Sequence, residues 1–143
     1  MRGFSAERFA AARHRSGLSV SDLSRLAGVG TSTVHGWERG RATPQIDLLA
    51  RIMLILEAPI SVVVNIDPQE RYPGDWRVLK GLTQPQLAAA AGIATTTLRG
   101  IERADLALTD TNAGTLARLL GIGVGEYRAS YQRARERPAG APV

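Results

Sequence analysis

The sequence predicts an all-helical fold made of two copies of one small unit. Three observations support this: the chain repeats itself, each copy has the residue spacing of amphipathic helices, and a segment with proline and glycine separates the copies. The 143 residues suit one domain or two very small ones, and the 44% hydrophobic content supports a packed core. We therefore expect two small helical domains rather than a disordered chain.

The repeat needs no gap when the sequence is displaced by 64 positions, so that Leu18 falls on Leu82. Further identities follow in both copies: Leu23 and Leu87, Ala27 and Ala91, Gly28 and Gly92, Thr31 and Thr95, Thr33 and Thr97, Gly36 and Gly100, Glu38 and Glu102, Arg39 and Arg103. Upstream, Arg13 falls on Arg77. Chance similarity over such a span is improbable, so duplication of one supersecondary unit is the economical explanation.

The domain boundaries follow from the repeat and from turn-forming residues. Residues 1–66 form the predicted first domain and residues 76–137 the second. Residues 67–75 contain two prolines and a glycine among polar residues, which predicts a linker. Residues 138–143, rich in proline, glycine and alanine, form a tail that we expect to be disordered.

The second helix of each copy has recognisable ends. Ser19 begins it, with Asp22 as capping partner, and Gly28 ends it because a left-handed residue reverses the chain there at little cost. Leu23, Leu26 and Ala27 are expected to face inward. In the second copy the equivalent roles fall to Thr83, Gln86 and Gly92.

A third helix is predicted over residues 31–39, with Val34 and Trp37 in the core. Its opposite face carries a small, polar and basic stripe, made of Thr31, Ser32, His35, Gly36 and Arg39 in the first copy and Thr95, Thr96, Arg99, Gly100 and Arg103 in the second. Such a stripe suits a helix that lies in a DNA major groove. Glycine within a helix costs about 1 kcal/mol relative to alanine. The two glycines are therefore either inherited through the duplication or needed where DNA or another helix approaches the backbone closely.

The composition favours a polyanionic partner and excludes several kinds of chemistry. Lys and Arg number 18 against 13 Asp and Glu, a net charge of +5, which points first to nucleic acid. The lack of cysteine excludes disulfides, thiolate metal sites and cysteine nucleophiles. His14 and His35 lie on different helices without carboxylates at metal-ligand spacing. We expect no enzymatic activity, no metal and no other cofactor.

Neither a secretory signal nor a membrane span is expected. Glu7 comes too early for a signal peptide, and the most apolar stretch, residues 48–64, contains Arg51, Glu57 and Pro59. The sequence therefore predicts a soluble, cytoplasmic protein.

Both copies resemble the Cro/repressor-type helix-turn-helix family, also called the XRE family. In the first copy the resemblance covers residues 5 to about 60 and rests on Leu18–Ser24, Gly28–Val29, Thr33–Gly40 and Pro44; in the second it covers 74 to about 130 and rests on Leu82–Ala88, Gly92–Ile93 and Thr97–Arg103. It implies two five-helix bundles, each with its third helix as the recognition helix. It also implies structural pairs that tie the first helix to the third, Arg13 with Glu38 and Arg77 with Glu102.

The resemblance and the outward stripes together predict the DNA contacts. The expected base-reading residues are Thr31, Ser32, His35, Gly36, Thr95, Thr96, Arg99 and Gly100, and the expected phosphate contacts are Ser19, Arg39, Arg41, Gln84 and Arg103. Gln84 matches the family glutamine that holds a phosphate, whereas the first copy has Val20 there. Arg99 is the best single reader, because a guanidinium can bind guanine O6 and N7 together.

Two segments depart from the family pattern. The second copy replaces the Gly-x-x-x-Pro ending by Ala104–Leu108, where Asp105 would repel a nearby phosphate. In the first copy, residues 60–66 are a β-branched run where the family usually has a fifth helix, and we predict a short β-strand there.

The sequence therefore predicts a sequence-specific repressor, of bacterial or phage-immunity type, that reads double-stranded DNA through both modules. The alternative is an antitoxin or adaptor in which one module binds DNA and the other binds a protein. Successive major grooves lie about 34 Å apart, and a linker of roughly ten residues can extend to about 33 Å. We therefore expect one chain to engage two sub-sites, the other possibility being a homodimer through residues 60–66.

Overall fold

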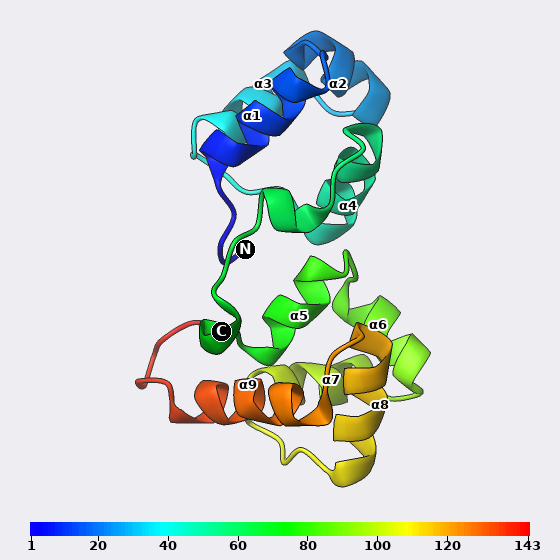
Figure 1. Ribbon diagram of the computed structural model, residues 1–143, viewed down its shortest axis with the longest axis vertical. Helices are drawn as coiled ribbons and strands as arrows, with labels where there is room; N and C mark the ends of the chain where they lie inside the picture. The colour runs from blue at the N-terminus through cyan, green and yellow to red at the C-terminus, as the bar shows by residue number, and fades with distance from the viewer. The chain divides into compact units, whose positions relative to one another are not determined.

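The computed structural model describes residues 1–143 and divides the chain into two compact units, Met1–Asn65 and Ile66–Val143 (Figure 1). We call them the first and the second module. No helix of either module is both long enough and apolar enough to cross a membrane.

The first module contains four α-helices and one 3-10 turn. The helices are α1 (Ala6–Arg15), α2 (Val20–Ala27), α3 (Thr31–Glu38) and α4 (Ile46–Ile55), and the turn η1 spans Ile60–Val62. The second module begins with the 3-10 turn η2 (Pro68–Glu70) and continues with α5 (Pro73–Leu79), α6 (Gln84–Ala91), α7 (Thr95–Glu102), α8 (Asp110–Leu120) and α9 (Val124–Glu136).

The elements follow the sequence repeat. Displaced by 64 positions, the bounds of α2 coincide with those of α6, the bounds of α3 coincide with those of α7, and the first residue of α4 falls on that of α8. The predicted helix ends are also confirmed: Ser19 and Thr83 close capping boxes, and Gly28 and Gly92 both have a φ of 71°. The all-helical fold of two tandem modules is therefore confirmed.

The core of the first module forms around two aromatic side chains. Phe9 of α1 meets Trp37 of α3 edge to face, with ring centroids 6.0 Å apart, a favourable geometry for an aromatic pair. Val34 and Leu23 are fully buried beside them. Of the three residues expected to face inward from α2, Leu26 is the exception, since 49% of it is exposed.

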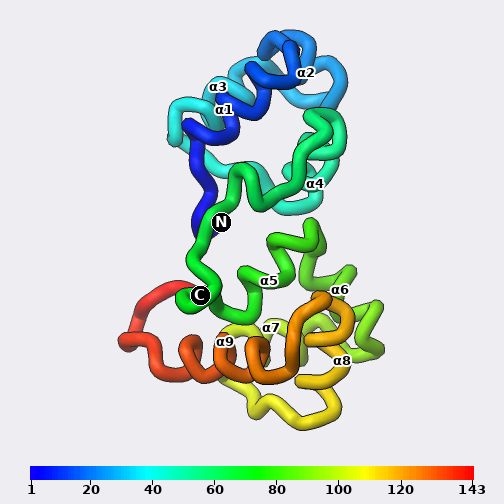
Figure 2. The backbone as a smooth tube through the Cα atoms, in the orientation of Figure 1, coloured from blue at the N-terminus to red at the C-terminus, as the bar shows by residue number.

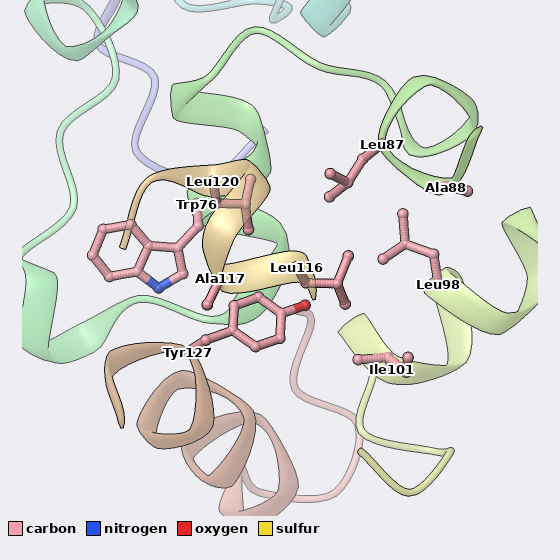
Figure 3. Close-up of a cluster of buried hydrophobic side chains, with 9 residues drawn as sticks. All are labelled: Trp76, Leu87, Ala88, Leu98, Ile101, Leu116, Ala117, Leu120 and Tyr127. Atoms are coloured by element: carbon pink, nitrogen blue, oxygen red, sulfur yellow. The ribbon is translucent and has the colours of Figure 1, made fainter. Parts of the chain in front are cut away.

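The second module has an equivalent core, drawn in Figure 3. Leu87 of α6 and Leu98 and Ile101 of α7 meet residues of α8, and Tyr127 of α9 completes the cluster. A helix-turn-helix pair braced by the other helices results, because α6 and α7 bury their apolar sides in one shared cluster.

The β-strand predicted over residues 60–66 is wrong. The run instead forms η1 and a single antiparallel bridge between Phe4 and Val64, and Figure 2 shows the N-terminal segment beside it. Val63 accepts a hydrogen bond from the backbone of Ser5 at 2.8 Å, and Asn65 donates to Gly3 at 2.9 Å. The β-branched side chains serve burial inside the module, with Val63 at 0% exposure. The run therefore offers no extended edge for a second subunit, and the first module has no fifth α-helix.

The linker predicted over residues 67–75 is largely structured. Pro73 opens α5 at its first turn, where a proline is favourable because that N–H needs no helical partner. Asp75 accepts a hydrogen bond from the backbone of Tyr72 at 2.8 Å and is buried. The proline interpreted as a linker residue thus marks a helix start. In the expected disordered tail, residues 138–141 form a turn in which Ala141 donates to Pro138.

Candidate nucleic-acid interface

The recognition helices α3 and α7 both begin with open N-termini. Their N-cap residues, Gly30 and Ala94, make no side-chain capping bond. The backbone N–H groups of a first helical turn have no partner within the helix and attract anions such as phosphate. The start of each recognition helix therefore adds a backbone donor surface to the side chains of its stripe.

In the first module the predicted base-reading stripe is bare. Thr31, Ser32 and His35 are exposed, while Val34 and Trp37 on the opposite side of α3 are buried. Gly36 has no heavy atom of another segment within 4 Å of the position that a Cβ would take. This surface can accept a groove wall at short range, because no atom of the module fills the space where a side chain of residue 36 would lie.

In the second module the stripe is only partly open. Thr96 and Arg99 are exposed and Thr95 is half-buried. Gly100 is covered: a Cβ built on it would lie 2.5 Å from Cδ1 of Leu106 and 2.8 Å from its Cγ. The space beside Gly100 is therefore occupied by Leu106 of the same module.

The predicted phosphate contacts after the recognition helices also differ between the modules. Arg39 and Arg41 of the first module are exposed and pair with no carboxylate of the chain. In the second module Arg103 lies 3.4 Å from Asp105, the residue that replaces Arg41 in the repeat. Both partners are more than half exposed, so the pair adds little stability, but the carboxylate offsets the positive charge locally.

At the start of the second helix of each module, the first module is the one with a negative charge beside the predicted phosphate contact. The Ser19 hydroxyl accepts a hydrogen bond from the backbone N–H of Asp22, and the Asp22 carboxylate accepts one from the backbone N–H of Ser19. The Ser19 side chain and then its backbone lower the pKa of the Asp22 carboxyl. A phosphate would therefore meet an anionic capping partner there. The second module has the neutral Gln86 in the same position. The Gln84 side chain donates to Glu102 at 2.9 Å, so this amide is held against α7.

The two predicted arginine–glutamate pairs are confirmed. Arg13 donates to Glu38 through Nε at 2.6 Å and Nη2 at 2.9 Å, and Arg77 donates to Glu102 through the same atoms at 2.8 and 3.0 Å. Each arginine also donates through Nη1 to the carbonyl that precedes the capping residue, of Leu18 or Leu82. The hydrogen bond to Glu38 raises the pKa of Arg13, against the opposing effect of burial. These pairs orient the recognition helices and lie away from the exposed stripes.

Sequence reasoning missed the role of α9 in the second module. Two side chains of α9 and that of the residue after it hold the loop that follows α7. Tyr131 donates to the carbonyl of Leu106 at 2.7 Å and Arg135 to that of Ala104 at 3.4 Å. Arg137, which follows the helix, donates to the carbonyl of Arg103 at 2.7 Å. The loop lacks the glycine and proline of the first copy, and that departure was the available signal that other residues must hold it.

Comparisons with known families agree with this arrangement. Residues 6–63 match a family described as a helix-turn-helix domain, and residues 75–127 match another described as helix-turn-helix. A comparison with curated proteins finds no match. Each family match contains one capped second helix, one left-handed turn and one recognition helix. Domains of this type bind DNA and regulate transcription. The chain therefore belongs to the helix-turn-helix proteins and carries two domains of the Cro/repressor (XRE) type in tandem.

Proposed function

We propose that the protein is a sequence-specific transcriptional repressor whose two recognition helices, α3 and α7, both contact double-stranded DNA. The observation that carries the proposal is the exposed polar and basic stripe that each helix presents at the same place of the repeat. A repressor of this kind works in the cytoplasm or nucleoid of a bacterial host. Its domains are of a DNA-binding rather than a catalytic type.

The contacts divide into positioning and reading groups. In the first module, the DNA phosphate backbone is contacted by Arg39, Arg41 and the open N-terminus of α3. The base edges are read by Thr31, Ser32 and His35. In the second module Arg99 is the principal reader, because its guanidinium is exposed and suits guanine. The two stripes differ in chemistry, so their sub-sites differ in sequence and the operator is asymmetric.

The test is selection of a binding site from random duplexes, followed by affinity measurements on specific and random DNA. Arg99→Ala is expected to cost about 1–3 kcal/mol on the selected site and to relax preference at one base position. Arg103→Ala is expected to weaken all sequences alike and to reduce the salt dependence. Arg118→Ala, an exposed arginine at the end of α8 outside both stripes, is the matched control.

If Arg99→Ala lowered the affinity for specific and for random DNA equally, Arg99 of α7 would not read a base. Repression itself is tested by transcription from a promoter that overlaps the selected site. Added protein should lower the transcript yield, and a rise would make the protein an activator.

A second candidate is an antitoxin or adaptor in which the first module binds DNA and the second binds a protein. Three features of the second module favour it: Leu106 covers Gly100, Asp105 stands beside Arg103, and Gln84 is engaged by Glu102. Against it stands the exposed cation Arg99, which a converted surface has little reason to keep. This candidate would be favoured if Arg99→Ala left DNA binding unchanged while His35→Ala weakened it.

We also propose that one chain occupies the operator. One chain already carries two recognition helices, and residues 60–66 contain a 3-10 turn (Ile60–Val62) and one bridge to Phe4 rather than a strand that could pair two subunits. Native mass spectrometry on a minimal selected duplex should find one chain per duplex. Two chains on a palindromic site would overturn this part of the proposal.

A further inference from the structure

The second module places an apolar side chain where its recognition helix has none of its own. Leu106 lies over Gly100 so closely that its Cδ1, Cγ and Cβ fall within 2.5, 2.8 and 3.2 Å of the position of a Cβ on residue 100. The leucine thus occupies the space that a side chain of residue 100 would fill. It acts as a substitute side chain delivered from the following loop.

This position belongs to the outward stripe of α7. The buried side of the helix consists of Leu98, Ile101 and Glu102, whereas Thr96, Arg99 and Arg103 are exposed. Leu106 covers a helix position between these exposed residues and remains 45% exposed itself. A groove that receives the stripe therefore receives the leucine as well.

The loop that carries Leu106 is anchored on both of its sides. The backbone N–H groups of Asp105 and Leu106 both donate to the carbonyl of Gly100, at 2.9 and 3.1 Å. Tyr131 holds the carbonyl of Leu106 at 2.7 Å, and Arg137 holds that of Arg103 at 2.7 Å. A side chain presented from an ordered backbone binds with less loss of conformational entropy than one on a mobile loop.

The first module has no counterpart. The repeat places Ala42 where the second module has Leu106, and the position above Gly36 is open. The two modules therefore present different surfaces at the same point of their recognition helices, one polar and open and the other apolar.

We propose that Leu106 is a base-contacting residue that recognises the C5 methyl group of a thymine in the sub-site of the second module. The proposal rests on the proposed function of that module, namely that α7 enters DNA. Thymine alone among the four bases presents a methyl group in the major groove, and apolar side chains distinguish it by contact. Duplex DNA is favoured over a protein partner as the occupant, because the leucine covers Gly100, which follows the exposed Arg99 on a basic stripe of α7.

The experiment replaces each thymine of the selected site in turn by deoxyuridine, which removes only the methyl group. For the wild-type chain, this replacement at one thymine of the second sub-site should lower the affinity for the duplex about three- to fivefold, which is the contribution of one buried methyl group. Leu106→Ala should bind the thymine duplex more weakly by a similar factor and show no further loss with deoxyuridine at that position. Leu106→Met should retain the sensitivity, and Gly100→Ala should abolish it because the added Cβ displaces the leucine.

Ala42→Leu is the matched control, since it adds a leucine at the equivalent place of the first module and should leave the sensitivity of the second sub-site unchanged. Melting temperatures establish that each variant is folded. If Arg99→Ala weakens specific binding but no thymine depends on Leu106, the inference is overturned and the proposed function stands. If neither Arg99→Ala nor Leu106→Ala alters DNA binding, both fail together, and the face of α7 belongs to a protein partner.

Discussion

Left-handed backbone conformations recur at equivalent residues of the two modules, even where only one module has glycine. Gly40 has a φ of 72° and its counterpart Ala104 a φ of 58°, while Gly121 has a φ of 69° and its counterpart Glu57 a φ of 55°. A residue with a side chain loses about 1–2 kcal/mol in this conformation. The packing of the helices around each turn therefore imposes its geometry, and the module without glycine bears strain there.

Glu57→Gly should stabilise the first module by about 0.5–1 kcal/mol. Glycine removes the strain of the left-handed residue, and this gain exceeds the entropy that glycine adds to the unfolded chain. The measurement is urea unfolding followed by the fluorescence of Trp37, in a Trp76→Phe background that leaves one reporter. Gly121→Ala, which places a side chain at the equivalent left-handed residue of the second module, should destabilise that module when Trp76 is followed in a Trp37→Phe background. If Glu57→Gly lowered the stability of the first module, the inference of backbone strain at Glu57 would be refuted.

We expect Tyr127 to make the second module sensitive to alkali. Its hydroxyl is buried and has no hydrogen-bond partner in the chain, and burial, followed by the nearby charge of Glu102, raises its pKa well above its ordinary value. The ordinary pKa is about 10 and applies to the unfolded chain. The contribution to stability is therefore complete below about pH 10 and is lost as the pH rises further, because only the unfolded chain ionises readily.

Tyr127→Phe should abolish this alkaline loss. At neutral pH the variant should be as stable as the wild type or more stable, because it no longer buries an unsatisfied hydroxyl. Unfolding free energies between about pH 8 and 11.5, reported by Trp76 fluorescence in a Trp37→Phe background, test both expectations. An equally steep alkaline loss in the variant would assign the effect to other groups.

At the scale of the helices, one buried ion pair in each module decides how the recognition helix is held. Arg13 joins α1 to α3 through Glu38 and to the start of α2 through the carbonyl of Leu18. Its side chain is 9% exposed and that of Glu38 is 12% exposed. Removing one partner of such a pair leaves the other charge buried and alone, which destabilises a protein strongly.

Arg13→Ala should therefore lower the stability of the first module by about 3 kcal/mol, while the folded fraction still binds DNA. Arg39→Ala removes the same charge from an exposed position and should do the opposite, with stability changed by less than about 0.5 kcal/mol and DNA binding weakened. Thermal unfolding and DNA titration of both variants separate the effects. Unchanged stability with lost binding in Arg13→Ala would make that arginine a DNA contact.

At the scale of the whole molecule, the segment that follows the first module is bound to the second module rather than free. Arg133 of α9 donates to the carbonyls of Arg71 and Pro68 at 2.9 and 3.2 Å. Arg71 donates to the carbonyl of Ile66 at 2.9 Å, and its guanidinium lies 4.5 Å from the ring centroid of Trp76. While these hydrogen bonds hold, the segment cannot extend as a free linker of roughly ten residues would.

Trypsin should therefore cleave after Arg71 slowly in the wild-type chain and several-fold faster in Arg133→Ala, because cleavage needs the segment to open locally. Mass spectrometry of the timed digest identifies the cut. Arg118→Ala, which removes an exposed arginine of α8, should leave the rate unchanged. Rapid cleavage of the wild-type chain at this position would show that the segment is free.

Patterns confined to neighbouring residues were sufficient for much of the fold and of the candidate site. The capping boxes at Ser19 and Thr83, the turns at Gly28 and Gly92 and the inward Val34 and Trp37 depend on spacings of a few residues. The repeat then transferred each interpretation to the other copy. The Arg13–Glu38 and Arg77–Glu102 pairs followed from the family resemblance.

The remaining features depended on residues far apart in the chain. Val63 is paired with Ser5, Leu106 with Tyr131, and Arg71 with Arg133. Local patterns favoured a strand at residues 60–66 and a linker at residues 67–75, and they gave no sign of the leucine over Gly100, because they carry no information about these distant partners. Thus the sequence by itself determined two helix-turn-helix modules and the stripes of their recognition helices. Only the tertiary structure decided which parts of those stripes are open, because burial and hydrogen bonding are settled when distant segments pack together.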